Sequence, residues 1–359
     1  MSGLYLREEL LAPIREKVRA GREPWAAAYA RLIEAANEAL TQEPVCIRDN
    51  GGSPHFRQDA AYVEGQDGVR DGAANHASSR LGHVAGRRAR DLALAWRFTG
   101  EARYADKALE QIHTWCINRS TYMMPDGMVV DAWTPGGRYG GDVVMFAAMK
   151  DLFLAGYLLR DYPGWNLRAR AGVKRWVRDM VAPQRELMFY QGREMYNNWE
   201  DARLLYLAKA ALFLDDADLL IYVFERWRHT LPMKMTETGE LHRETMRTRS
   251  MTYTLASLDG TAEIAEIARQ LGEDLYDLTI DGKNLKLAVD YAAHGLLHID
   301  EWPHQLIRPL SEEFADRAAR LGVFELAHAR WGEKRYLDVI EAWGGRPVIA
   351  GHATLLHAI

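Results

Sequence analysis

The sequence GEARY at residues 100–104 opens an amphipathic run that ends at Trp115, and it recurs as GEKRY at residues 332–336 before a similar run to Trp343. A looser copy, GEDLY, stands at residues 272–276. In the first two copies the glycine is typical of a helix end, and the glutamate suits the positive N-terminus of the next helix. Unless the three turns are coincidental, the repeat predicts helical hairpins.

Apolar residues recur at helical spacing through most of the chain, as in the run from Leu204 to Leu212, whereas strand-like alternation is scarce. Short interruptions such as Tyr162-Pro163-Gly164 and Asp215-Asp216 separate the runs. The irregular spacing of the repeat disfavours a regular solenoid. We therefore predict an all-α fold, an α/α toroid (incomplete barrel) of about five to seven helical hairpins that spans residues 1–359 as a single domain.

The composition is that of an ordinary globular chain, with 359 residues, 48% hydrophobic and 26% charged, which excludes disorder, collagen and coiled coil. The net charge is -5 and no run of five like charges occurs, so nucleic-acid binding has no electrostatic support. No segment is apolar enough to span a membrane, and residues 1–24 lack the features of a signal peptide. We expect no nucleic-acid or membrane partner and a cytoplasmic location, or a secreted or periplasmic one if a leader was trimmed. The oligomeric state is open.

Several kinds of chemical site have no support in the sequence. Cys46 and Cys116 are too few for a disulfide scaffold, and we interpret both as buried thiols. His294 and His298 share a helix face, but Gly295 stands where a metalloprotease needs glutamate, which favours a structural pair. The sequence has no phosphate loop, dinucleotide fingerprint or nucleophile elbow. We therefore predict no cofactor and no metal site.

Two long segments resist the helical pattern, at residues 45–72 and 121–141. Loops of this length inside a compact helical domain are usually functional or disordered. Their aromatic and arginine content argues against disorder, so we predict ordered loops that line a binding cleft.

Two polar stretches between apolar helices are the candidate site. YNNWED at residues 196–201 precedes a strongly periodic helix, and its alternative interpretation is a helix cap. HRETMRTRSMTY at residues 242–253 leads into another helix. If that stretch is already helical, Arg249 and Tyr253 share a face, with Arg247 about a turn and a half before the tyrosine. An arginine beside a phenol favours the phenolate, which suits proton transfer on an anionic substrate; the alternative is a solvated charged face.

At these residues the sequence resembles the alginate lyase domain, a family of uronate-polysaccharide lyases built on α/α toroids. The resemblance covers most of the chain from about Pro54 to Pro309, and the order of its motifs is its best support. The motifs are residues 92–100, Met124-Pro125, Asn197-Asn198, Arg247 or Arg249 with Ser250 and Tyr253, and Trp302-Pro303-His304.

The resemblance implies cleavage of a uronate polymer by β-elimination, with mannuronate-rich alginate or glucuronan as the substrate. It assigns Asn198, assisted by Arg247, to neutralising the substrate carboxylate, because the developing charge needs fixed donors. It makes Tyr253 the general acid and, where the proton and the leaving oxygen share a face of the sugar, the base as well.

One departure concerns the base. Alginate lyases of this kind commonly have histidine after the second asparagine, where this chain has Trp199. Either Tyr253 acts alone, or a distant histidine such as His76 or His242 supplies the base. The expected substrate-binding residues are Arg249, Asn197, Trp199, Arg138, Tyr139, Arg57, His76, His242 and Trp133, the last as a stacking platform; for the loop residues the alternative is simple loop anchoring.

Two other functions are open on the sequence. An α/α-toroid glycoside hydrolase would use two carboxylates, for which Asp142, Glu200 and Asp201 are candidates. A non-catalytic carbohydrate-binding or scaffold protein would bind without turnover.

Overall fold

The computed structural model describes residues 5–56, 60–61, 77–125, 138–139, 142–185, 189–190, 193–313 and 321–359. The chain divides into two compact units. Unit 1 comprises Met1–Leu32, Tyr196–Leu204 and Ile221–Ile359, and unit 2 comprises Ile33–Met195 and Leu205–Leu220. The single toroidal domain expected from the sequence stays a prediction.

Helices make up most of the described chain, which confirms the all-α class. They are α1 (Glu8–Arg19), α2 (Trp25–Thr41), α3 (Ala77–Thr99), α4 (Ala102–Cys116), α5 (Asp142–Leu158), α6 (Leu167–Arg185), α7 (Asn198–Leu214), α8 (Ala217–Lys234), α9 (His242–Thr245), α10 (Ser250–Gln270), α11 (Leu285–Leu297), α12 (Leu310–Glu313), α13 (Gly322–Trp331), α14 (Lys334–Trp343) and α15 (Ala353–His357). The strands have two residues each and form two antiparallel pairs, β1 (Ala60–Ala61) with β2 (Arg138–Tyr139) and β3 (Phe189–Tyr190) with β4 (Arg193–Glu194).

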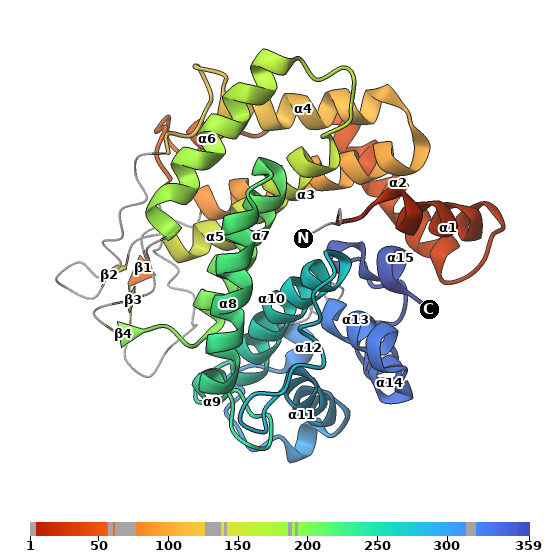
Figure 1. The fold of residues 1–359 in the computed structure, drawn as a ribbon, viewed down its shortest axis with the longest axis vertical. Coiled ribbons are helices and arrows are strands. Elements are labelled where there is room, and N and C mark those ends of the chain that lie inside the picture. The colour runs from red at the N-terminus through yellow and green to blue at the C-terminus, as the bar shows by residue number, and fades with distance from the viewer. Residues whose placement is uncertain are drawn as a thin grey trace. The chain divides into compact units, whose positions relative to one another are not determined.

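In unit 2, helix α3 packs against both α4 and α5 (Figure 1). The approach to α5 is close because α3 carries glycines at the contact: a Cβ added at Gly82 would lie 2.9 Å from the Cβ of Ala148. A buried ion network adds to this packing, since Arg90 and Lys209 both bind the Asp151 carboxylate, at 2.6 and 3.1 Å. Unit 2 therefore combines close helix packing with paired internal charges.

In unit 1, α10 packs against α11 and α13, and α14 packs against both of the latter (Figure 1). Helix α14 is held at both ends: the Tyr336 hydroxyl donates to Asp290 at 2.6 Å, and the Trp343 indole donates to the Leu296 carbonyl at 2.8 Å. The inner face of α10 is fully buried, for example at Leu255. This helix is thus a rigid central element of its unit.

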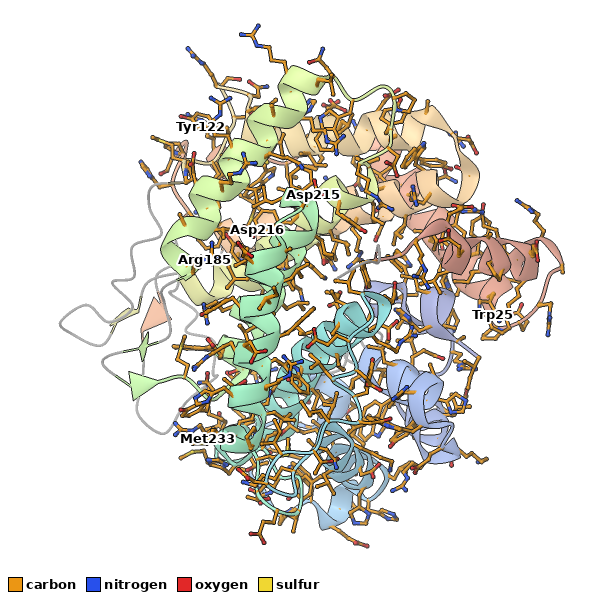
Figure 2. All side chains as sticks on the ribbon, in the orientation of Figure 1. Trp25, Tyr122, Arg185, Asp215, Asp216 and Met233 are labelled. Atoms are coloured by element: carbon orange, nitrogen blue, oxygen red, sulfur yellow. The ribbon has the colours of Figure 1, made fainter. Side chains whose placement is uncertain are left out.

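The hairpin turns follow the sequence prediction. Gly100 and Gly332 have φ of +75° and +69°, each directly after a helix, and the glutamate after each glycine precedes the next helix. A left-handed backbone at these points is what glycine permits without steric cost. Figure 2 shows Asp215 and Asp216 at another predicted turn, between α7 and α8.

The two long loops of unit 2 meet each other. Ala61 pairs with Arg138 in the β1–β2 ladder, and the Met124 N–H donates to the Pro54 carbonyl at 2.8 Å. The start of the first loop is anchored where the Trp115 indole donates to the Val45 carbonyl at 2.7 Å. Residues 45–72 and 121–141 are therefore joined where the structure describes them, and their expected role in a cleft stays a prediction.

Other expectations concern single residues and single helices. Cys46 and Cys116 are free and buried, as predicted. None of the helices in the described part of the chain has both the length and the apolar character needed to cross a membrane.

Candidate active site

The first turn of α7 begins with a helix cap. The Asn197 carbonyl accepts the N–H groups of Glu200 and Asp201, at 3.0 and 3.3 Å, and its side-chain oxygen accepts the Trp199 N–H at 3.2 Å. These bonds satisfy backbone N–H groups of the first turn, which have no acceptor within the helix. The cap interpretation is therefore correct for Asn197.

Asn198 is not used in this way. Its backbone N–H donates to Glu244 Oε1 at 2.6 Å, whereas its half-buried side-chain amide makes no hydrogen bond within the described residues. The amide oxygen is fully enclosed. The amide nitrogen of the same side chain has no acceptor among the described residues, so it can donate a hydrogen bond to a ligand. The amide of Asn198 is thus a candidate for binding a ligand.

The first turn of α10 holds Tyr253. The turn is fixed at Ser250, whose hydroxyl donates to the Gln305 carbonyl at 2.8 Å and accepts the Trp302 indole N–H at 2.8 Å. Tyr253 is half-buried, and its hydroxyl makes no hydrogen bond to the described part of the protein. A rigid helix turn therefore presents a phenol that a substrate can engage.

The guanidinium of Arg247 stacks on this tyrosine, 3.9 Å from the ring centroid. Arg249 is the N-cap of α10, with φ of -120°, and its carbonyl accepts the Tyr253 N–H at 3.1 Å. Arg249 also forms an isolated bridge with Leu306. Of the two arginines considered from the sequence, Arg247 is the one whose guanidinium stacks on the tyrosine ring.

Glu244 was not predicted, although it lies inside the quoted stretch. Its side chain is buried, with 1% exposed, and it joins the two halves of the site: Oε1 accepts the Asn198 N–H, and Oε2 lies 3.9 Å from Arg247. Burial, with the nearby charge of Asp201, raises the pKa of Glu244 to about 8, although the Asn198 N–H and the cations of Lys234 and Arg243 act in the opposite direction. Near neutral pH this carboxyl is therefore mostly protonated.

A buried clamp holds the two helices of the site. Asp201, one turn after Asn198, binds Lys234 at 2.6 Å and accepts the Ser257 hydroxyl at 2.5 Å and the Thr261 hydroxyl at 3.1 Å. Gly260 lets α10 approach α7, since a Cβ added there would lie 3.1 Å from the Asp201 Cβ. Ser257 lies one turn after Tyr253, so the clamp fixes the helix turns from which the functional groups project.

The carboxylates proposed for a hydrolase do not suit that role. Glu200 is 1% exposed and binds Arg203 and Arg226, at 2.7 and 2.8 Å. Asp201 is engaged by the clamp. Both side chains are about 1% exposed and are hydrogen-bonded inside the protein, so neither is open to a sugar. The side chain of Asp142 lies outside the described residues.

The other predicted residues are placed as follows. His242 is the exposed first residue of α9, and partial desolvation, with the charge of Arg243, lowers its pKa. Trp199 is half-buried in the first turn of α7. Arg138 and Tyr139 form β2 in unit 2, and their side chains lie outside the described part, as do Arg57, His76 and Trp133.

A metal site finds no support in the described ranges. They contain no group of three or more His, Cys, Asp or Glu side chains that could hold a metal ion. His294 and His298 are exposed neighbours with ring centroids 4.6 Å apart.

Comparison with known proteins relates the chain to one family. Residues 16–302 match the protein-family model described as alginate lyase. An alginate lyase from Bacteroides ovatus superimposes with a TM-score of 0.81 at 20% identity, over 98% of this chain and 97% of that one. Alginate lyase A1-III from Sphingomonas species A1 gives 0.64 at 17% identity, over 97% and 94%. A tyrosine-to-phenylalanine variant of alginate lyase A1-III complexed with tetrasaccharide gives 0.68 at 18%, over 97% and 94%.

At these identities the structural likeness shows a shared fold. No curated protein sequence matches the chain.

Proposed function

The chain belongs to the alginate lyase family and is a polysaccharide lyase, and from this premise we propose that it cleaves mannuronate-rich alginate or glucuronan by β-elimination. The observation that carries the proposal is the side-chain amide of Asn198 and the hydroxyl of Tyr253, neither hydrogen-bonded within the described residues, with Arg247 on the tyrosine ring. The solved relatives named as alginate lyases, one complexed with a tetrasaccharide, support an acidic sugar polymer as the substrate.

The first requirement is to acidify the proton at C5 of the uronate. Removing this proton pushes negative charge onto the C6 carboxylate, so donors fixed beside the carboxylate lower the barrier. In our proposal the Asn198 amide donates to one carboxylate oxygen, and the charge of Arg247 stabilises the same group. Both are held by rigid elements before substrate arrives.

Tyr253 then transfers the protons. The Tyr253 phenolate takes the C5 proton; the electron pair forms the C4–C5 double bond as the C4–O4 bond breaks, and the phenol returns its proton to O4. One group can serve both ends only when the proton and O4 lie on the same face of the ring, as in mannuronate and glucuronate. Tyr253 as sole base also accords with Trp199 in place of a histidine.

The loop residues extend the proposal to neighbouring sugars. Arg57 and Arg138 would pair with carboxylates of the polymer, and Trp133 and Tyr139 would stack on sugar rings. Since the protein has a net charge of -5, attraction of the polymer depends on local arginines, and added salt should weaken binding.

The test is ultraviolet absorbance of the protein incubated separately with polymannuronate, polyguluronate, glucuronan and hyaluronan, because elimination creates an absorbing unsaturated sugar. We expect product from polymannuronate or glucuronan. Tyr253→Phe should lower the rate by at least about 100-fold with oligosaccharide binding largely kept, and Asn198→Ala should lower it about 100-fold. Tyr162→Phe is the matched control, since it removes an exposed phenol bonded to Asp106 in unit 2.

Normal turnover by Tyr253→Phe would refute the assignment of the acid. An unchanged rate in Asn198→Ala would reduce Asn198 to a structural residue. Release of reducing ends without ultraviolet absorbance would mean hydrolysis and would overturn the proposal.

A further inference from the structure

Glu244 is a buried side chain that meets both carboxylate-binding candidates. Through Oε1 it accepts the Asn198 N–H at 2.6 Å, and through Oε2 it lies 3.9 Å from Nη1 of Arg247. The Asn198 N–H is at the start of α7, 46 residues away in the sequence. Glu244 therefore fixes the position of Asn198 relative to Arg247. The guanidinium of Arg247 in turn stacks on Tyr253.

We propose that Glu244 is a positioning residue of this site, which holds Asn198 and Arg247 so that both face one substrate carboxylate. The inference rests on the proposed function, because it assumes a uronate carboxylate as the bound group. Glu244 itself does not touch the substrate, since its side chain is 1% exposed.

The charges around Glu244 explain why the uncharged form is the working one. Asp201 faces it from α7, Lys234 from α8 and Arg243 from its own helix α9, with Arg247 beside it in the turn that leads to α10. Because burial raises the pKa of Glu244 to about 8, this carboxyl keeps its proton at neutral pH. Protonated Glu244 carries no charge and does not neutralise Arg247. Ionised Glu244 would form an ion pair with Arg247.

Ionisation of Glu244 should weaken binding of the uronate carboxylate. A carboxylate at position 244 would repel the uronate group and draw the guanidinium towards Oε2, away from the substrate. We therefore expect KM to rise with pH through the ionisation of Glu244.

The experiment measures kcat and KM on the cleaved polymer between about pH 6 and pH 10, for the wild type and for Glu244→Gln, Glu244→Ala and Glu237→Gln. Glutamine keeps the acceptor for the Asn198 N–H and cannot ionise. We expect Glu244→Gln to stay within about threefold of wild-type kcat/KM at pH 7 and to lose the alkaline rise in KM. Glu244→Ala loses the acceptor and should fall about 100-fold. Glu237→Gln, which removes an exposed charge in the same unit, should keep the wild-type profile.

The inference is overturned if Glu244→Gln keeps the alkaline rise in KM, or falls as far as Glu244→Ala, because then the charge or a different group is required. It is also overturned if a folded Glu244→Ala retains wild-type kcat/KM. Should the alanine variant not fold, the pH profile of the glutamine variant decides alone. A wild type that yields no unsaturated product on any polymer overturns the proposed function instead, which separates the two failures.

Discussion

Replacing Glu200 by glutamine should destabilise the protein severely, whatever it does to catalysis. Glu200 accepts two hydrogen bonds from Arg203, both at 2.7 Å, and one from Arg226 at 2.8 Å, and all three residues are buried. Glu200→Gln removes the carboxylate charge that these two buried guanidiniums share. Removing one partner of a buried pair costs about 3–5 kcal/mol, so we expect the free energy of unfolding to fall by about 4 kcal/mol.

The measurement is urea unfolding followed by tryptophan fluorescence and circular dichroism, in a cycle with Arg226→Met and the double variant. Removing Arg226 takes away one of the two cations. The loss in free energy of unfolding of the double variant should therefore be smaller than the sum of the losses of the two single variants, by at least about 1 kcal/mol. A loss below about 1 kcal/mol in Glu200→Gln, or strict additivity in the cycle, would refute the reasoning. Wild-type stability with lost turnover would restore Glu200 as a catalytic carboxylate.

Two further predictions concern stability. The pKa of Glu244 is about 8 in the folded protein against an ordinary 4.5, so between these values the folded state keeps a proton that the unfolded chain has released. The free energy of unfolding of the wild type therefore falls as pH rises through this window, and the stability of Glu244→Gln relative to the wild type should rise by about 5 kcal/mol. Thermal unfolding at both ends of the window measures this, and a constant difference would contradict it. Gly332→Ala should cost about 1 kcal/mol because its φ is +69° with no atom within 4 Å of the added Cβ. Gly322→Ala, with an ordinary φ and neighbours no closer than 3.6 Å, is the control and should cost less; equal losses would show that backbone strain is not the cause.

Local chemistry made part of the structure predictable. The turns at Gly100 and Gly332 depend on residues adjacent in the sequence, and so does the cap at Asn197, where the bonds reach two to four residues ahead. Such features need no knowledge of the rest of the fold. The all-α class likewise follows from a periodicity that each helix carries in its own sequence.

The features that sequence reasoning missed depend on distant contacts. Helix α10 starts at Ser250, whose partner Gln305 lies 55 residues further on, and Arg249 before it is a non-helical N-cap. Glu244 acquires its role from Asn198, 46 residues earlier. The sequence shows that these polar residues are present but not which of them meet.

Gly260 has a consequence for how the site could be adjusted. Its bare Cα lets α10 lie against Asp201 of α7, at a point where even one methyl group would stand 3.1 Å from the neighbouring Cβ. Helices of this length behave as stiff rods, so a few tenths of an ångström gained there would be carried to the turns that bear Asn198 and Tyr253. Gly260 lies two turns after Tyr253 in α10 and has no functional group of its own. The distance between the Asn198 amide and the Tyr253 phenol therefore depends on the lack of a side chain at Gly260.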